Sequence, residues 1–302
     1  MSIESLEKRL VAVLEANQIL RNEPMARHTT FKVGGPADLF VAPSSVDEVC
    51  ACVAAAQEED VPWRMLGAGS KVIVSDEGVR GVVIHLGKNY SSIAINGTFV
   101  YAQAGATNEE VAVKALDKGL RGYEFASGIP GSVGGAAIMN AGAYDGDFKD
   151  VCESIVCLTP EGKVLEIGVD DAELGYRHSL MMDKGYVVLE AILGLQPGDT
   201  ATIAAKIEEL SRRRAEKQPL DVGSAGSTFK RPEGYYAGQL IEEAGMRGHR
   251  VGDAMVSEKH CGFVVNMGKA TAADVLAVIH DVQEAVLRSA GVQLEPEVRI
   301  WD

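Results

Sequence analysis

Residues 122–144, GYEFASGIPGSVGGAAIMNAGAY, contain six glycines and five alanines, so much of this backbone carries no bulky side chain. Glycine tolerates positive φ and lets a ligand approach the peptide closely, although it weakens the packing of its own segment. We therefore expect something large and flat, such as a cofactor, to lie against the main chain here. A flexible linker is the alternative, but a linker rarely interleaves apolar residues such as Ile129, Val133, Ile138 and Met139.

A second glycine cluster lies upstream and points to the same kind of ligand. The apolar run 63–66 predicts a short strand that leads into Gly67, Ala68, Gly69, Ser70 and Lys71. A strand followed by a tight glycine turn commonly holds phosphate. Neither cluster has the G-x-G-x-x-G spacing of a Rossmann fold or the G-x-x-x-x-G-K-[ST] spacing of a P-loop. Two such glycine clusters, each a candidate cradle for part of a ligand, lie in one half of the chain. They suit a dinucleotide with two phosphates and two rings.

Composition limits the remaining possibilities. With 302 residues, 46% of them hydrophobic, the chain is long enough for two or three globular domains. A formal charge of -14 disfavours nucleic acid as a partner, because polyanion affinity comes chiefly from neutralised phosphates. No apolar stretch approaches the roughly 18 residues of a membrane span, so we expect a cytoplasmic protein with no membrane partner. Five cysteines without a CxxC pair predict free thiols and no metal site.

Helical and strand patterns are mixed along the chain, which predicts an α+β fold. One amphipathic helical face is formed by Ile3, Leu6, Leu10, Val13 and Leu14. Ser45 with Glu48, and Thr107 with Glu110, have the spacing of capping boxes at helix starts. Further helices are expected over 200–216, 238–244 and 271–290, and strands over 63–66, 82–86, 99–103, 155–158, 164–167, 186–195, 263–266 and 298–301.

Four side chains outside the glycine clusters could carry chemistry. Ser227 lies in the small-residue segment SAGSTFK, although a turn serine is more often structural. Arg177, in GYRHS, could clamp a carboxylate with two hydrogen bonds or form a surface salt bridge. Glu297 could equally be a solvated carboxylate on an edge strand, and His260 a satisfied structural histidine. The residues alone lead to an enzyme that binds a flavin or a nucleotide.

An ordered set of motifs extends this interpretation over nearly the whole chain. It runs HTTF at 28–31, GGPAD at 34–38, GAGSK at 67–71, EFASGIPGSVGGAAIMNAGAY at 124–144, YRHS at 176–179, SAGSTFKRP at 224–232, VSEKH at 256–260 and LEPEVR at 294–299. This set resembles the UDP-N-acetylenolpyruvoylglucosamine reductase family of peptidoglycan precursor synthesis. The chain is similar to the compact class of that family, which lacks an extra tyrosine loop.

The resemblance implies a fold and a reaction. The fold would be a FAD-binding domain of the vanillyl-alcohol-oxidase type in two subdomains, 1–88 and 89–200, followed by a substrate-binding domain over 201–302. Residues 295–302 could pack back on the first subdomain. FAD and NADPH would be the cofactors, and the substrate a small molecule, the enolpyruvyl ether of UDP-N-acetylglucosamine. Hydride would pass from flavin N5 to the vinyl carbon. We expect a monomer.

Site residues follow from the same resemblance, position by position. Arg177 and Glu297 would stabilise the enolate, and Ser227 would donate the proton. Substrate contacts would come from Tyr176, Lys217, Lys230 and His260, whereas Arg231 and Cys261 match no family role. The FAD contacts would be Gly67, Ala68, Gly69, Ser70, Lys71, Ser127, Gly128, Ile129, Pro130, Gly131, Ser132, Gly134, Gly135, Asn140, Ala141, Gly142 and Ala143.

Two other interpretations compete with this one. An alcohol oxidase or dehydrogenase could share the FAD-binding half, but it would leave the SAGSTFK and EPEVR segments unexplained. A catalytically silent FAD or UDP-sugar binding module would be expected to lack at least one of Ser227, Arg177 and Glu297, and all three are present.

Overall fold

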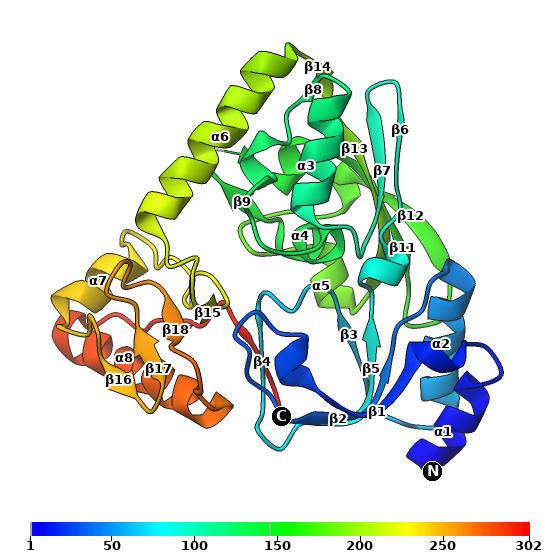
Figure 1. Ribbon diagram of the computed structural model, residues 1–302, viewed down its shortest axis with the longest axis horizontal. Coiled ribbons are helices and arrows are strands. Elements are labelled where there is room, and N and C mark those ends of the chain that lie inside the picture. Colours follow the sequence, from blue (N-terminus) through cyan, green and yellow to red (C-terminus); the bar gives the residue numbers. More distant parts are fainter. Residues whose placement is uncertain (1, 145) are drawn as a thin grey trace. The chain divides into compact units, whose positions relative to one another are not determined.

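The computed structural model describes residues 2–144 and 146–302 and forms two compact units (Figure 1). The first unit comprises the chain up to Arg21 together with Leu39–Ala68 and Gly81–Arg214. The second comprises Asn22–Asp38, Gly69–Arg80 and Ala215–Asp302. Each unit is therefore assembled from three separate stretches of sequence. The division into 1–88, 89–200 and 201–302 stays a prediction.

A five-stranded antiparallel sheet forms the centre of the first unit, in the order β12-β11-β13-β7-β6. Its side chains alternate between two faces, as the period of two in a strand requires. Val100 and Ala102 of β7 are buried on one face, whereas Phe99 is exposed. The strands are β6 (Ile93–Asn96), β7 (Phe99–Gln103), β11 (Cys152–Leu158), β12 (Val164–Gly168) and β13 (Val187–Gly194).

Helices α3 (Asn108–Asp117) and α4 (Val133–Met139) pack on this sheet, α4 against both β7 and β13. A second pair, α1 (Ile3–Leu10) and α2 (Val46–Glu58), pack on each other. The unit also contains α5 (Leu180–Lys184) and the long α6 (Thr200–Lys217) as far as Arg214.

A separate four-stranded sheet has the order β1-β2-β5-β3, in which β3 and β5 run parallel. Its strands are β1 (Ile19–Pro24), β2 (Pro36–Val41), β3 (Trp63–Leu66) and β5 (Val79–His85). Two short pairs join β8 (Leu120–Arg121) to β14 (Gln196–Pro197) and β9 (Gly142–Ala143) to β10 (Gly146–Asp147). Short 3-10 helices lie at Ala16–Gln18, Met25–Arg27, Lys88–Tyr90, Glu124–Ala126, Phe148–Asp150 and Val169–Asp171.

The second unit has its own sheet and its own core. The sheet order is β15-β18-β17-β16, and Phe31, Ile73 and Val275 are fully buried in one apolar cluster. The last strand, β19 (Arg299–Trp301), pairs in parallel with β4 (Val72–Val74). The other elements are β15 (Gly223–Ser224), β16 (Arg250–Val251), β17 (Ala254–Val256), β18 (Val264–Asn266), α7 (Ala237–Glu243) and α8 (Ala272–Ala290).

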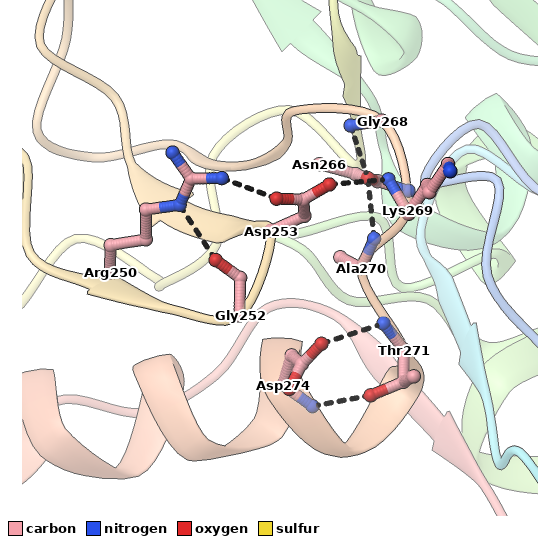
Figure 2. Close-up of polar contacts among 9 residues, drawn as sticks. All are labelled: Arg250, Gly252, Asp253, Asn266, Gly268, Lys269, Ala270, Thr271 and Asp274. Atoms are coloured by element: carbon pink, nitrogen blue, oxygen red, sulfur yellow. Dashed lines mark hydrogen bonds and ion pairs between the residues drawn. The ribbon is translucent and has the colours of Figure 1, made fainter.

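A polar network fixes the turn that enters α8 (Figure 2). The Asn266 side-chain oxygen accepts hydrogen bonds from the backbone of Gly268 and Ala270, at 2.9 and 3.0 Å. Asp253 accepts one from the Lys269 backbone and pairs with Arg250. Because Asn266 and Ala270 are buried, the hydrogen bond between them satisfies polar groups that would otherwise cost free energy.

Asp76 adds a second cap to the same helix. Thr271 and Asp274 form a reciprocal capping box at the start of α8. The Asp76 carboxylate accepts hydrogen bonds from the backbone N–H groups of Ala272 and Ala273, at 2.8 and 2.9 Å. An anion at a helix N-terminus is favoured by the unpaired N–H groups and by the helix dipole. Within the second unit, this contact ties Gly69–Arg80 to the C-terminal helix.

Most elements expected from the sequence are confirmed, but two details in the N-terminal part of the chain are wrong. The strands over 63–66 and 99–103 have the expected bounds, and Thr107 with Glu110 forms a complete capping box. Val13 does not extend the first helix, because α1 ends at Leu10 and Val13 is exposed. Ser45 caps α2, but the Glu48 carboxylate bonds to the Ser44 backbone instead of completing the box.

The five cysteines are all free thiols. Cys52, Cys152 and Cys157 are buried, and burial raises the pKa of each thiol to about 12. None of the helices in the described part of the chain is long and apolar enough to cross a membrane.

Replacing Asp76 with Ala should loosen the start of α8. Loss of a helix cap costs about 1 kcal/mol, so amide exchange in the first turns of α8 should accelerate about fivefold. Hydrogen-exchange mass spectrometry on peptides from 271–280 measures this directly. Glu77→Ala, one residue along, is the matched control and should leave exchange unchanged. Equal exchange in both variants would contradict the capping role of Asp76.

Candidate functional site

The start of the first predicted glycine cluster contacts the second cluster within the first unit. Strand β3 ends at Leu66 and delivers Gly67, and Ser132 is the N-cap of α4. A Cβ placed on Gly67 would lie 2.3 Å from the Ser132 hydroxyl oxygen, so no side chain fits between them. Segments far apart in sequence are thereby brought into contact where the sequence predicted one ligand. Gly69, Ser70 and Lys71 belong to the second unit, where a Cβ on Gly69 would lie 2.0 Å from the His28 carbonyl oxygen.

The second cradle is partly helical, and this helix is not among those expected from the sequence. Residues 133–139 form α4, and the hydroxyl of Ser132 accepts a hydrogen bond from the Gly135 backbone. A Cβ on Gly134 would lie 2.8 Å from the Cβ of Ala104, so this glycine lets the helix approach the sheet. At Gly135 the nearest atom would be 3.6 Å away and the residue is exposed. Packing of α4 against the sheet thus explains why residue 134 is a glycine. At Gly135, in contrast, the backbone is accessible to a ligand.

The residues on either side of α4 are held by hydrogen bonds. Ser127 donates its hydroxyl to the Glu124 carbonyl oxygen at 2.8 Å, and Ile129 accepts from the Asn108 amide at 3.2 Å. Gly131 has φ of 150°, a conformation that favours glycine. Asn140 donates to the Gly175 carbonyl oxygen at 3.2 Å, which joins the end of α4 to the turn at 175–178. Also placed before or after α4 are Gly128, Pro130, Ala141, Gly142 and Ala143.

Arg214 belongs to this site and was missed by the sequence reasoning. It is 6% exposed, and its Nε atom has no hydrogen-bond partner among residues 2–144 and 146–302. A Cβ on Gly128 would lie 2.9 Å from Nη1 of Arg214, and the guanidinium carbon lies 5.6 Å from the centre of the Tyr144 ring. A buried cation beside a side-chain-free backbone favours an anionic or electron-rich ligand. The only sequence signal is the run of three arginines at 212–214, near the end of the helix expected over 200–216.

Arg177 lies at the tip of a tight turn in the first unit. Gly175 and His178 exchange backbone hydrogen bonds of 3.1 and 3.2 Å, which leaves Tyr176 and Arg177 between them. Arg177 has φ of 53°, in the left-handed region that few residues other than glycine adopt. Its guanidinium lies 5.1 Å from the Tyr176 ring centre. The hydroxyl of Ser179 anchors the turn to α4 by donating to the Ile138 carbonyl oxygen.

Glu297 and the Ser227 segment come together in the second unit. Glu297 is 4% exposed, so the alternative of a solvated carboxylate is wrong. The Lys71 ammonium lies 2.8 Å from a Glu297 carboxylate oxygen and donates to the Ser227 carbonyl oxygen at 2.7 Å. The Glu297 backbone N–H donates to the Thr228 carbonyl oxygen at 2.8 Å. Two of the three candidate catalytic residues are thus adjacent, and Arg177 lies in the other unit.

The predicted substrate contacts differ in their surroundings. Tyr176 and Lys217 are exposed, and Lys230 forms an ion pair with Glu295. His260 accepts a hydrogen bond from the Gly262 backbone, and burial lowers its pKa. The hydrogen bond from Gly262 fits the alternative in which His260 is a structural histidine. The Arg231 guanidinium lies 4.0 Å from the Tyr236 ring centre, and Cys261 is buried. No group of three metal-binding side chains occurs in the described ranges.

Comparison with known proteins identifies the family. The family description "FAD binding domain" matches residues 37–168, and "UDP-N-acetylenolpyruvoylglucosamine reductase, C-terminal domain" matches 218–301. A reductase of that name from Lachnoclostridium phytofermentans is 48% identical over 297 residues, 97% of this chain and 96% of the relative. One from Agathobacter rectalis is 50% identical over 294 residues, 93% of each chain. The chain belongs to the UDP-N-acetylenolpyruvoylglucosamine reductase family.

Solved structures agree with this membership. The crystal structure of UDP-N-acetylenolpyruvylglucosamine reductase from Thermus caldophilus has a TM-score of 0.81 and 33% identity, and covers 94% of this chain and 98% of that one. Alkyldihydroxyacetonephosphate synthase, at 20% identity and a TM-score of 0.51, covers 65% of this chain and 44% of that one and shares the fold alone. The predicted α+β fold with a FAD-binding domain of the vanillyl-alcohol-oxidase type is confirmed.

Family membership also establishes the class of chemistry. The chain is a FAD-dependent oxidoreductase, with FAD and NADPH as its cofactors. Its residues fit FAD, because two glycine segments touch at Gly67 and Ser132 and the buried Nε of Arg214 faces no partner in the described structure. The match over 218–301 removes the competing oxidase or dehydrogenase interpretation, which left that segment unexplained.

Gly134→Ala should destabilise the protein, because the added methyl group would press against Ala104 at 2.8 Å. Overpacking of this kind costs about 1–3 kcal/mol. Gly135→Ala is the matched control in the same helix, and it should keep or slightly raise stability because alanine is the better helix former. Thermal unfolding followed by circular dichroism compares the two. A Gly134→Ala protein as stable as the control would refute the packing explanation.

His178 should titrate above its ordinary pKa of 6.5. A hydrogen bond from the ring to Asp183 raises the pKa most, and one to the Glu173 carbonyl oxygen adds to it. Because the folded-state pKa is raised, the contact stabilises the turn fully below about pH 6.5 and is lost as pH rises through the folded-state value. NMR titration should show the His178 pKa falling in Asp183→Asn and unchanged in Asp170→Asn. An unshifted pKa in the unsubstituted protein would contradict this.

Proposed function

We propose that this protein reduces the enolpyruvyl ether of UDP-N-acetylglucosamine to UDP-N-acetylmuramate, with NADPH as the source of electrons. The observation that carries the proposal is the pairing of a buried Glu297 with the Ser227 segment, in a chain that matches this family of reductases over nearly its full length. When bound, FAD supplies hydride from N5 to the vinyl carbon of the substrate. The protein residues must then stabilise the negative charge that develops on the substrate and supply a proton to it.

Charge develops next to the substrate carboxylate during this reaction. Hydride addition to the vinyl carbon leaves carbanion character on its neighbour, delocalised into the carboxylate oxygens, so groups that stabilise that charge accelerate the reaction. Arg177 is suited to this role because a guanidinium binds a carboxylate through two parallel hydrogen bonds. In this proposal Glu297, together with Arg177, stabilises the enolate. The left-handed backbone of Arg177 holds its Cα at the tip of a two-residue turn.

Ser227 supplies the proton in this proposal. A serine hydroxyl is a poor acid in water, but the carbanion formed here is strongly basic, and cations near the serine stabilise the alkoxide that remains. Lys71 donates to the main-chain oxygen of Ser227 itself, and Lys230 follows three residues later. Tyr176, Lys217, Lys230 and His260 are proposed substrate contacts, for which local positive charge must offset a chain charge of -14.

We further propose that the protein acts as a monomer in the cytoplasm on this small-molecule substrate. The chain covers nearly the full length of the family, and the silent-module alternative does not account for the presence of Ser227, Arg177 and Glu297 together.

Ser227→Ala should separate the two half-reactions. Reduction of the flavin by NADPH needs no proton donor for the sugar nucleotide, so its rate should stay nearly unchanged. Reoxidation by the enolpyruvyl sugar nucleotide should slow by about 10²–10⁴-fold, the usual contribution of a general acid. Anaerobic stopped-flow absorbance measures each step separately.

Ser224→Ala provides the control for this experiment, because it removes a hydroxyl from the same segment without touching the proposed proton donor. Both half-reactions should proceed normally in that variant. If Ser227→Ala slowed flavin reduction as much as reoxidation, the serine would serve the cofactor rather than the substrate, and its assignment as proton donor would fail.

A further inference from the structure

Lys71 connects the two candidate catalytic residues of the second unit. Its ammonium nitrogen lies 2.8 Å from a Glu297 carboxylate oxygen and 2.7 Å from the Ser227 carbonyl oxygen. A lysine ammonium has three N–H donors and no acceptor, so both contacts can be made at once. One side chain therefore contacts both the Ser227 main chain and the Glu297 carboxylate, in addition to the backbone hydrogen bond from Glu297 to Thr228.

Burial distinguishes this ion pair from an ordinary surface salt bridge. The Glu297 side chain is 3% exposed and that of Lys71 is 26% exposed. Exposed pairs contribute little, because water screens them and two long side chains must be ordered. A buried carboxylate, in contrast, needs a partner to offset the loss of its hydration. Lys71 provides a cation for this compensation at Glu297.

The backbone around Lys71 is fixed as firmly as its side chain. The Lys71 carbonyl oxygen accepts a hydrogen bond from the Arg299 N–H at 2.7 Å, and Val72–Val74 continue as β4 beside β19. Glu297 lies two residues before β19, and Lys71 directly precedes β4. The pairing of these two strands therefore positions the backbone of both residues in the ion pair. On the other side, a Cβ on Gly226 would lie 3.5 Å from the Lys71 nitrogen. The Lys71 ammonium therefore lies close to the backbone at Gly226 as well as to Ser227 and Glu297.

We propose that Lys71 is a positioning residue for the second half-reaction: it holds the Glu297 carboxylate and the Ser227 main chain in one arrangement, and it acts through them. The inference rests on the proposed function, because Ser227 and Glu297 are its targets. This role concerns the Lys71 side chain and is separate from the FAD contact that the family resemblance predicts for this residue.

Lys71→Met tests the proposal, because methionine keeps an unbranched apolar side chain and removes the ammonium. The FAD content and the rate of flavin reduction by NADPH should stay within about twofold of those of the unsubstituted enzyme. Reoxidation by enolpyruvyl-UDP-N-acetylglucosamine should slow by about 10- to 100-fold, a range that coupling between contacting residues reaches. Lys71→Arg should restore part of that rate, because it returns a cation with several donors.

A double-variant comparison separates positioning from a general structural role. If Lys71 acts through Glu297, then Lys71→Met combined with Glu297→Gln should be reoxidised about as fast as Glu297→Gln alone. The double variant also leaves no buried charge unpaired. If Lys71→Met alone fails to fold, the comparison of the double variant with Glu297→Gln still tests the proposal. Independent, multiplying losses in the double variant would overturn the proposal.

Two further outcomes are distinguishable from each other. Loss of FAD from Lys71→Met, or reoxidation at the unsubstituted rate, would overturn the role of Lys71 while leaving the proposed function intact. Failure of the unsubstituted enzyme to be reoxidised by the sugar nucleotide would overturn the proposed function and, with it, the role assigned to Lys71.

Discussion

The parallel pairing of β4 with β19 is the constraint on which the second unit depends. It places the last residues of the chain beside Val72–Val74, which lie in the first third of the sequence. Each backbone hydrogen bond contributes only about 1 kcal/mol net, so the pairing also relies on the apolar cluster around Ile73 and Phe31. Because Lys71 precedes one strand and Glu297 the other, the ion pair between them forms only when this pairing forms. The strand pairing and the ion pair of the candidate site are therefore built from the same two segments.

Local signals in the sequence were sufficient to predict most of the secondary structure. Strands such as 63–66 and 99–103 were recognisable because their apolar residues lie between clear turn residues, and Thr107 with Glu110 form a cap whose two partners are three residues apart. The errors arose where tertiary contacts decide. Glu48 bonds to Ser44 and also accepts from the Gln18 amide, a partner distant in sequence. Helix α4 was missed because glycine lowers helix propensity, which packing against Ala104 overrides.

The candidate site shows the same division between local and distant information. Motif order predicted the family, the cofactors and the kind of chemistry, and membership confirms these. The burial of Glu297 could not be predicted, because a glutamate followed by an alternating strand looks like any edge residue. The contact of Lys71 with Ser227 joins residues 156 positions apart, and no pattern in either segment encodes it. Arg214 was hidden because its partners, Gly128 and the Tyr144 ring, become neighbours only in the folded unit.

The buried thiols have a consequence for the chemical durability of this flavoprotein. A reduced flavin exposed to air generates peroxide, and peroxide and alkylating agents attack the thiolate form of cysteine. With a pKa of about 12, Cys52, Cys152 and Cys157 are ionised to roughly one part in 10⁵ at pH 7. These three residues act as small apolar side chains that fill the core. The first unit can therefore bind a redox cofactor while these three thiols stay almost entirely un-ionised.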